Sequence, residues 1–512
     1  MTNVREQLGT IVSTMEGPSP STISFVINNG KAHKGMFAEL DYSEGTMMLL
    51  VEDVIKTNRY FERPDSVKVI GEELEKNFPA SDWEFLIAKA RPLGVFTEKN
   101  IQRATFPPSP GTKVFNADNE KIRKFLGLEE NGLNLGALQF HDVGLKVNLS
   151  KLLQKHLAIV ATSGAGKSYF VSVLLEELLS RKKEQGQIGV VVIDTHGEYT
   201  CFGEPVKQSS ANQFTDFSSK TKIIEGSKIR IACSKMSIHM ISAIVELSPN
   251  QKRALARILS KLNDEMKSGA GPYDLSAVRA EVAAIDNEKT QASLFGVVSD
   301  LEEIGLFGKI DEPSIVDFVK PGAMVVIDLN SVVSEKKKQV LVAYLSNKLF
   351  NERRSSSKKI PPFALFVEEA HNFIPEGTAS EHAVARSYLR TIAREGRKFG
   401  ASLVVISQRP KRLDTTTLAN CNTSIILRIT NPYDLDHIAQ SSEGLDKSSI
   451  GIISSLRVGE ALVVGEAVGA PTFFKVRLRK SQPSRHESTL EDSARAFSAE
   501  VEKKSDETNT FL

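Results

Sequence analysis

The sequence is organised around one short stretch, Ala161-Thr-Ser-Gly-Ala-Gly-Lys-Ser168, between an apolar run at 157–160 and a helical pattern at 169–183. In such a strand, glycine turn and helix, the free backbone N–H groups at the helix start point at an anion. Lys167 is expected to reach the β and γ phosphates, and the Ser168 hydroxyl to ligate Mg²⁺. The stretch therefore predicts a phosphate-binding loop that holds a nucleotide and Mg²⁺.

The residues predicted to bind the nucleotide are those of the loop and the first helical turn: Ser163, Gly164, Ala165, Gly166, Lys167, Ser168 and Tyr169. One position departs from the common pattern, because Ala161 stands where the first glycine is usual. Alanine there requires a negative φ.

The length and composition indicate a soluble multidomain protein. At 512 residues the chain is too long for one hydrophobic core, and its net charge of +2 excludes a uniformly basic nucleic-acid binder. No apolar run reaches membrane-spanning length, and the first residues lack a signal-peptide pattern. The three cysteines are far apart, which indicates neither a disulfide framework nor a zinc site. We expect a cytoplasmic protein without a membrane anchor.

Hydrophobic patterning predicts the fold class. The first hundred residues show short strands separated by turns, as in a small antiparallel barrel. Later apolar, β-branched runs alternate with helices, as in a buried parallel sheet. The result is an α/β protein with five parts in chain order: 1–110, a β-barrel; 111–235, the first part of an ATPase core; 236–308, an inserted helical bundle; 309–480, the rest of the core; 481–512, a C-terminal arm or tail. The last part is either a disordered tail or an arm that orders on a partner.

Carboxylates follow three of the predicted core strands: Asp194, Asp328 and the tandem pair Glu368-Glu369. Nucleotide hydrolysis needs one acidic group near the metal and another to orient or deprotonate water. Glu369 is the predicted catalytic base, and Glu368 is expected to act on Mg²⁺ through its water shell. The alternative for the pair is an acidic helix N-cap.

Two further strand ends carry polar residues. Asp194-Thr-His-Gly-Glu-Tyr199 is a polar cluster, in which Asp194 is a second candidate for Mg²⁺ or its waters, while His196 and Glu198 are candidates to couple the site to a moving loop. For His196 a structural role is an equal alternative. Gln408 follows another strand and is predicted to sense the γ phosphate, or else is an ordinary polar loop residue.

A basic helix end, Ala393-Arg-Glu-Gly-Arg-Lys-Phe-Gly400, precedes the strand that leads to Gln408. Arg394 or Arg397 is predicted to stabilise transition-state charge in the site of a neighbouring subunit. The alternative is that these cations complement the helix dipole. Lys155 is a weaker candidate for the same contact.

Five motifs occur in an order that resembles the HerA family of archaeal DNA translocases: Thr162-Ser-Gly-Ala-Gly-Lys-Ser168, Ile193-Asp-Thr-His-Gly-Glu-Tyr199, Val367-Glu-Glu-Ala-His-Asn-Phe373, Arg394-Glu-Gly-Arg-Lys-Phe-Gly400 and Ser407-Gln-Arg-Pro410. The resemblance implies a RecA-like P-loop ATPase core, a barrel domain and a C-terminal arm. It also implies a homohexameric ring that moves double-stranded DNA by using ATP, together with a NurA-type nuclease in DNA end resection. Ala161 and Lys155 depart from that family, which often has Gly and Arg there.

Other function classes fit the sequence less well. A GTPase-like switch lacks its guanine-reading motif, because Asn347-Lys348 continues into Leu-Phe, and a small-molecule kinase does not need a barrel and a bundle. A related FtsK- or VirB4-like ATPase that pumps DNA or protein in another process is the main alternative. The candidates for a DNA track are Lys207, Lys220, Lys222 and the loop 374–383.

Overall fold

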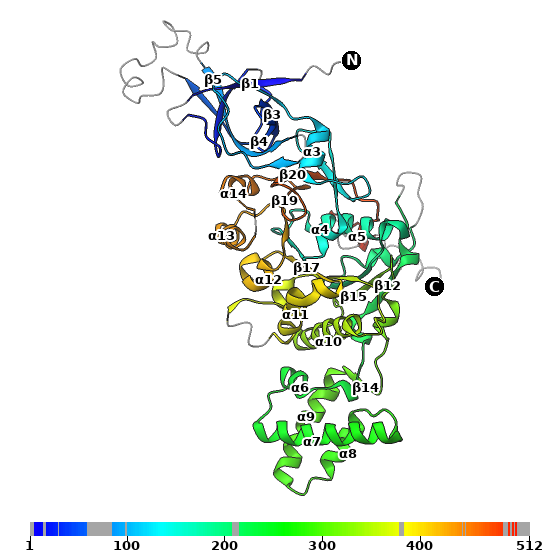
Figure 1. Ribbon diagram of the computed structural model, residues 1–512. Helices are drawn as coiled ribbons and strands as arrows, with labels where there is room; N and C mark the ends of the chain where they lie inside the picture. Colours follow the sequence, from blue (N-terminus) through cyan, green and yellow to red (C-terminus); the bar gives the residue numbers. More distant parts are fainter. Residues whose placement is uncertain are drawn as a thin grey trace. The chain divides into compact units, whose positions relative to one another are not determined.

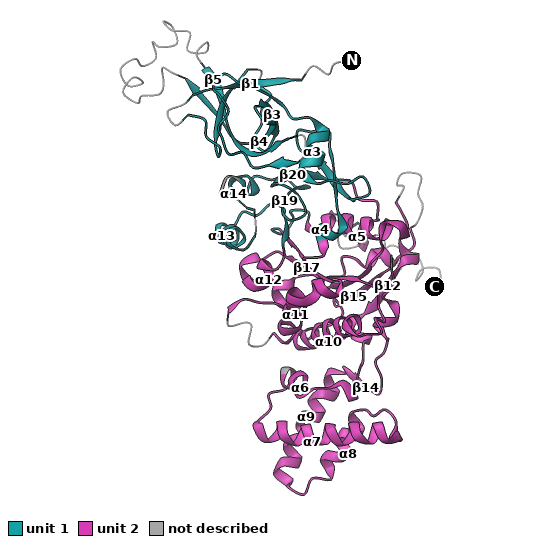
Figure 2. Cartoon of the chain, in the orientation of Figure 1, with its two compact units in different colours: residues 1–152, 161–166, 422–477 teal, residues 153–160, 167–421, 478–512 magenta. Residues whose placement is uncertain are grey.

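The computed structural model describes residues 5–13, 17–28, 30–58, 84–97, 100–206, 214–377, 383–442, 444–445, 447–484, 490–491, 494–495 and 497–498. The chain divides into two compact units, shown in Figures 1 and 2. Unit 1 comprises 1–152, 161–166 and 422–477, and unit 2 comprises 153–160, 167–421 and 478–512. Lys207, part of the loop 374–383 and most of the C-terminal part 481–512 lie outside the described residues.

The N-terminal part of unit 1 is a small antiparallel barrel. Its strands are β1 (Gln7–Ile11), β2 (Ile23–Ile27), β3 (Phe37–Tyr42), β4 (Gly45–Asn58), β5 (Glu84–Phe96), β6 (Ile101–Gln102) and β7 (Lys113–Asn116). The order is β2-β1-β7-β3-β4-β5-β6, and the sheet closes because β2 also pairs with β5. This confirms the predicted barrel, whose last strand lies beyond the expected boundary at residue 110.

The barrel interior is filled by apolar side chains from alternate strand positions, such as Leu8, Phe25 and Leu40, which are fully buried. The β3–β4 turn requires glycine at position 45. Its φ is +145°, and a Cβ there would lie 1.9 Å from the carbonyl oxygen of Phe96. Glycine at position 45 therefore allows β4 and β5 to approach closely at this point.

Unit 1 also holds a run of five further strands, each antiparallel to its neighbours. It consists of β18 (Thr423–Ile426), β19 (Glu460–Gly465), β20 (Thr472–Val476), β8 (Leu133–Leu138) and β9 (Gly144–Val147), in that order. Strands β19 and β20 pair as an antiparallel hairpin. Three helices belong to the same unit: α3 (Asn119–Leu126), α13 (Pro432–Ser441) and α14 (Lys447–Ile453).

Unit 2 contains the parallel sheet that the apolar runs predicted. Its strands, in spatial order, are β12 (Thr221–Glu225), β15 (Met324–Asp328), β11 (Gly189–Asp194), β16 (Phe363–Val367), β17 (Ala401–Ser407) and β10 (Leu157–Val160). Every neighbouring pair is parallel, so all the carboxyl ends lie at one edge. The sheet confirms the predicted α/β class. Sequence patterning missed β12, because four of its five residues are exposed or half-buried.

Helices α5 (Lys167–Ser180), α10 (Glu335–Arg354), α11 (Val384–Phe399) and α12 (Thr415–Ala419) accompany this sheet (Figure 1). Helix α11 illustrates how sequence sets the packing. It buries Leu389, Ile392 and Ala393 on one side, and it ends at Gly400, which has φ +67°. An apolar stripe that packs against the core and a C-cap glycine in the left-handed conformation are common features of such helices.

An inserted bundle of α6 (Ile238–Ile244), α7 (Pro249–Glu265), α8 (Leu275–Ala283) and α9 (Glu288–Ile304) interrupts unit 2 between β12 and β15. Helix α7 begins with a capping box, in which Ser248 and Gln251 accept hydrogen bonds from each other's backbone N–H groups. Two lysines at the start of α10 donate to the ends of two bundle helices. Lys336 Nζ lies 3.0 Å from the carbonyl oxygen of Ile244, and Lys337 Nζ lies 3.0 Å from that of Ile304.

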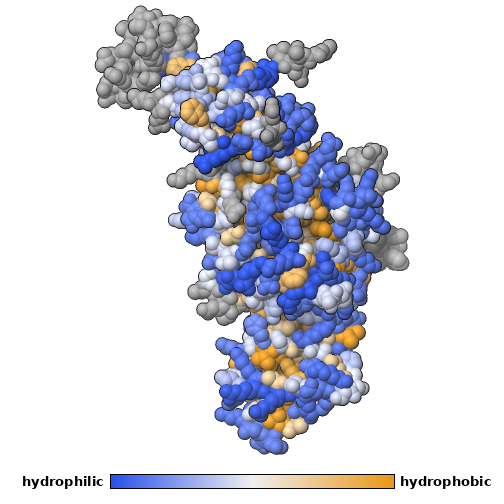
Figure 3. All heavy atoms as spheres, viewed as in Figure 1, coloured by the Kyte–Doolittle hydropathy of each residue, from blue (hydrophilic) through white to orange (hydrophobic). Residues whose placement is uncertain are grey.

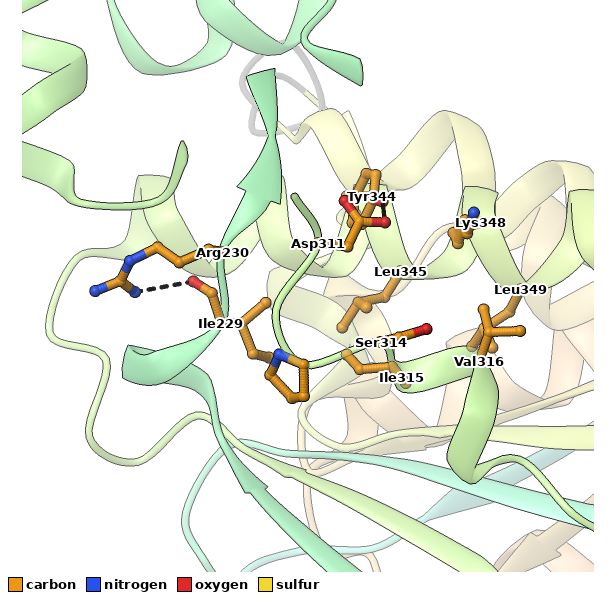
Figure 4. Close-up of a pocket in the computed structure, with 11 residues that line it drawn as sticks. Ile229, Arg230, Asp311, Ser314, Ile315, Val316, Tyr344, Leu345, Lys348 and Leu349 are labelled. Atoms are coloured by element: carbon orange, nitrogen blue, oxygen red, sulfur yellow. Dashed lines mark hydrogen bonds between the residues drawn. The ribbon is translucent and has the colours of Figure 1, made fainter. Parts of the chain in front are cut away.

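The neck of this insertion is the parallel pair β13 (Ile231–Ala232) and β14 (Phe307–Gly308). A small cavity lies beside it, between Arg230, Asp311 and the α10 residues Tyr344 and Lys348 (Figure 4). Its volume is about 20 Å³, enough for about one water molecule and too small for a nucleotide. The space-filling view shows apolar residues between hydrophilic ones on the visible face of the bundle (Figure 3).

Candidate functional site

The phosphate-binding loop has the backbone that its sequence predicted. Strand β10 ends at Val160, and α5 begins at Lys167. Gly164 and Gly166 have φ values of +73° and +94°, which favour glycine. Ala161 is buried and is not among the residues with positive φ, so alanine fits this position without strain.

Lys167 is buried and contacts the predicted catalytic base directly. Its Nζ atom lies 2.7 Å from Glu369 Oε1, and the same oxygen accepts a hydrogen bond of 2.7 Å from Gln408 Nε2. Burial raises the pKa of Glu369, but the charge and hydrogen bond of Lys167 outweigh it, and the net effect is a lowered pKa. Glu369 is therefore held as a carboxylate, the form that a general base requires.

His371 approaches the other oxygen of this carboxylate. Its Nδ1 atom lies 3.2 Å from Glu369 Oε2 and 3.1 Å from Ser407 Oγ. Burial lowers the pKa of His371, and the charge of Glu369 offsets this only partly. Sequence reasoning gave His371 no role, although it lies two positions after the acidic pair.

The backbone at Glu369 is in the left-handed region, with φ +45° and ψ +46°. Such a conformation costs roughly 1–3 kcal/mol for a residue with a side chain. It is adopted directly after the buried strand β16, at the turn between Val367 and the short helical segment Ala370–Asn372. This turn sets the direction of the Glu369 side chain toward Lys167.

Glu368 has a different environment from its neighbour. Its Oε2 atom accepts hydrogen bonds from the backbone N–H and the hydroxyl of Thr195, at 3.0 and 3.3 Å. Its Oε1 atom is buried without a hydrogen-bond partner among the described residues, 3.9 Å from Lys167 Nζ. Burial, then the charges of Glu198 and Asp194, raise the pKa of Glu368 well above its usual range. The pKa values of these two adjacent carboxyls are thus shifted in opposite directions.

The unpartnered Glu368 Oε1 fits a magnesium ion carried by the nucleotide, because Mg²⁺ takes oxygen ligands directly or through water. The part of the chain that the structure describes holds no group of three or more His, Cys, Asp or Glu side chains able to bind a metal alone. Ser168 begins the same helix as Lys167 and remains the predicted direct ligand.

Asp194 anchors the polar loop that follows β11. Its Oδ1 atom accepts hydrogen bonds from the backbone N–H groups of His196, Gly197 and Glu198, and Oδ2 accepts one of 2.8 Å from Tyr199. Both oxygens therefore hold the polar loop in shape. This geometry favours an anchoring role for Asp194 and gives no support to the predicted contact with Mg²⁺. His196 is exposed, and Tyr199 is fully buried.

Arg394 and Arg397 lie exposed on α11, and neither forms an ion pair within the described residues. Arg397 is in the last helical turn, so the alternative of a dipole-complementing cation also fits. Their predicted action in a neighbouring site stays a prediction.

Helix α5 is also bound by residues 478–484, in the C-terminal part of unit 2. The backbone N–H of Arg479 donates to the Tyr169 hydroxyl at 2.8 Å, and the Arg479 guanidinium lies 5.3 Å from the centre of the Tyr169 ring. Glu176 Oε1 accepts from the N–H groups of Lys480 and Ser481 and from the Ser481 hydroxyl, at 2.7–2.8 Å. Sequence reasoning did not find this attachment, because a buried glutamate in an apolar helix has no distinct pattern.

The parallel sheet, the loop before α5 and the acidic pair after β16 define a P-loop ATPase, an enzyme that hydrolyses ATP. The family model "Helicase HerA, central domain" matches residues 133–349. A probable helicase of Methanocaldococcus jannaschii is 28% identical over 86% of this chain and 86% of its own length. The DNA double-strand break repair helicases HerA of Pyrococcus furiosus and Saccharolobus solfataricus are 26% and 29% identical, over 80% and 72% of this chain and 80% and 73% of their own lengths. Residues 133–349 thus match the HerA central domain, and the chain is similar to HerA helicases over most of its length.

Among solved structures, the VirB4 protein of Thermoanaerobacter pseudethanolicus is 18% identical, with a TM-score of 0.49. The match covers 68% of this chain and 97% of that one. No helix within the described ranges is long and apolar enough to cross a membrane.

Proposed function

We propose that this protein is a ring-forming, ATP-driven translocase or helicase for double-stranded DNA. The observation that carries the proposal is the cluster of Lys167, Glu369 and Gln408. It lies at the carboxyl ends of the parallel strands, which we call the nucleotide edge, in a chain whose residues 133–349 match the HerA central domain. Relatives named as DNA double-strand break repair helicases support DNA as the substrate. By the same resemblance, the protein forms a homohexamer and works with a NurA-type nuclease in DNA end resection.

In this proposal ATP exchanges partners with Glu369. The phosphates of ATP take the place of the Glu369 carboxylate at Lys167, because the lysine ammonium group cannot bind both at the same time. The freed carboxylate then accepts a proton from the water that attacks the γ phosphorus, and ADP leaves as the β–γ bond breaks. Mg²⁺, held by Ser168 and near Glu368, supplies charge neutralisation on the phosphates when bound.

Gln408, His371 and an arginine of a neighbouring subunit act around this step. Gln408 bonds Glu369 before ATP binds, so it senses whether the carboxylate has moved. His371 steadies the second oxygen of Glu369 and is fixed by Ser407. Arg394 or Arg397 of a neighbouring subunit stabilises charge on the transferring phosphoryl group.

The five-part division of the chain belongs to the same proposal: barrel, two portions of ATPase core, inserted bundle and C-terminal arm. Residues 478–484 attach that arm to α5, the helix that begins with Lys167 and Ser168. Movement of the arm and occupancy of the nucleotide site are thus expected to influence each other.

The test is the rate of ATP hydrolysis with and without linear duplex DNA. We expect duplex DNA to stimulate hydrolysis by the parent protein, and Glu369→Gln to remove hydrolysis under both conditions. The proposal would be ruled out if the parent protein hydrolysed ATP at the same rate with and without duplex DNA and Glu369→Gln hydrolysed it at the normal rate. Mass measurement with DNA and a non-hydrolysable ATP analogue tests the ring.

A further inference from the structure

The parallel sheet of unit 2 has a second edge, where its strands begin. Because all neighbouring pairs are parallel, the segments leading into the strands gather there, at the end opposite Asp194 and Glu369. Five such segments lead into β11, β12, β15, β16 and β17: residues 181–188, 218–222, 319–323, 353–362 and 397–400. We call this set the basic edge.

The basic edge concentrates positive charge. Its five segments contain twelve Lys or Arg residues and one acidic residue, Glu184, which gives a formal charge of +11. The carboxylates within two residues of these segments, Asp216, Asp317, Glu352 and Glu395, reduce this to +7. The whole chain carries only +2, so most of the compensating negative charge lies elsewhere.

Many of these cations are available for a partner. Lys182, Lys183, Lys320 and Lys358 are exposed, and none forms an ion pair within the described part of the chain. Others are engaged: Lys220 Nζ donates to the carbonyl oxygen of Leu179, and Lys359 lies 3.8 Å from Glu352. The free lysines belong to segments before β11, β15 and β16, three consecutive strands of the sheet.

The spacing of the edge suits an extended polyanion. Strands lie about 4.8 Å apart, so the segments before β12 through β17 span roughly 19 Å. Duplex DNA carries one charge per about 1.7 Å of its axis, or about eleven phosphate charges over that length. The basic edge can therefore meet a phosphate backbone over a long path.

The side chains favour nucleic acid over a protein partner. Protein interfaces are enriched in aromatic residues and depleted in lysine, whereas contacts to phosphate come from Lys and Arg. At this edge the nearby aromatic rings are covered by cations: Lys222 lies over Phe318, and Arg354 lies over Phe350. The surface offered is thus charged and flexible.

We propose that the basic edge binds the phosphate backbone of duplex DNA, without reading its sequence, as a contact separate from the nucleotide edge. The five-residue strand β16 puts roughly 16 Å of sheet between the two edges. The choice of duplex DNA rests on the proposed function. Of the three lysines considered as a DNA track, Lys220 and Lys222 lie at this edge.

The test compares the full-length protein with a variant carrying Lys182→Ala, Lys183→Ala, Lys320→Ala and Lys358→Ala. Affinity for a random-sequence duplex is measured from 50 to 300 mM salt in a titration series. The matched control removes two exposed cations of the bundle, Lys252→Ala and Lys289→Ala. ATP hydrolysis without DNA serves as the measure of an intact fold.

The expected result is that the salt slope of log K falls by up to about 3.6 for the edge variant, at about 0.9 per lost phosphate contact. Basal hydrolysis stays unchanged, and the bundle control binds as the parent does. Equal affinity and slope for the edge variant and the parent would overturn the inference. Binding of polyglutamate, a model of an acidic protein, is measured with the same variants. If the edge variant loses polyglutamate binding but keeps DNA binding, the inference is also overturned, because the basic edge would then bind an acidic protein. A parent that does not bind duplex DNA contradicts the proposed function itself.

Discussion

Lys167 Nζ and Glu369 Oε1 are 2.7 Å apart, so the phosphate-loop lysine and the predicted base form a buried ion pair. Binding ATP must break this pair, since the lysine is needed by the phosphates. The free energy of this exchange sets both the affinity for ATP and the moment at which the base becomes available.

Glu369→Gln is expected to lower kcat for ATP hydrolysis by about 100-fold or more, because the general base is lost. It is also expected to tighten ATP binding about tenfold, because a charged hydrogen bond to Lys167, worth roughly 1.5–3 kcal/mol, no longer competes. Hydrolysis rates and titration with a fluorescent ATP analogue measure the two effects. Glu184→Gln, in an exposed short 3-10 helix, is the control and should change neither. Weaker binding of the analogue by Glu369→Gln would contradict the exchange.

Gln408→Ala removes the second donor to Glu369 Oε1. We expect kcat to fall about tenfold with little change in KM, because the amide orients the base and does not bind the ground state. Gln408→Glu should be more harmful, since it places a second carboxylate beside Glu369. A rise in KM at unchanged kcat would show instead that Gln408 binds substrate.

We predict that the free energy of unfolding of unit 2 depends on pH because of His156. His156 is buried, its Nδ1 atom accepts the backbone N–H of Leu403 at 2.9 Å, and burial lowers its pKa to about 4. Because the folded pKa lies below the unfolded value of about 6.5, stability is complete above pH 6.5 and falls as the pH drops toward 4. The loss is about 3 kcal/mol.

His156→Asn tests this dependence, because Asn tolerates the φ of +64° and keeps an acceptor. Denaturant unfolding from pH 7 to 4.5 should show a shallower loss of stability for the variant than for the parent. The exposed His196→Asn is the control. Parallel pH profiles for His156→Asn and the parent would mean that His156 does not carry the effect.

Glu176→Ala should release residues 478–484 from α5. The change leaves three donors without their shared acceptor, and we expect a cost of about 3 kcal/mol in the free energy of unfolding. Cleavage by a protease between residues 478 and 484 should also become faster. The neighbouring Glu177→Ala removes a 3.5 Å ion pair with the half-exposed Lys480 side chain and no bond to the backbone of 480–481, so it should have a smaller effect. Equal protease sensitivity of the two variants would contradict this account.

The sequence was sufficient to predict the phosphate loop, the barrel and the parallel sheet, because each has a strong local pattern of glycines or apolar residues. Strand β12 was missed, since its half-exposed residues resemble a loop. The four backbone hydrogen bonds to Asp194 were not predictable either, because they depend on the path of the following loop. The Lys167–Glu369 pair joins residues about two hundred positions apart, and only the register of β10, β17 and β16 brings them together.

The central claim, ATP-driven movement along duplex DNA, is tested most directly by displacement of a third strand annealed to a linear duplex. We predict that the parent protein displaces this strand only with ATP, and that Lys167→Ala displaces none while still assembling to the parental mass. Displacement by Lys167→Ala, or by the parent without ATP, would contradict the account.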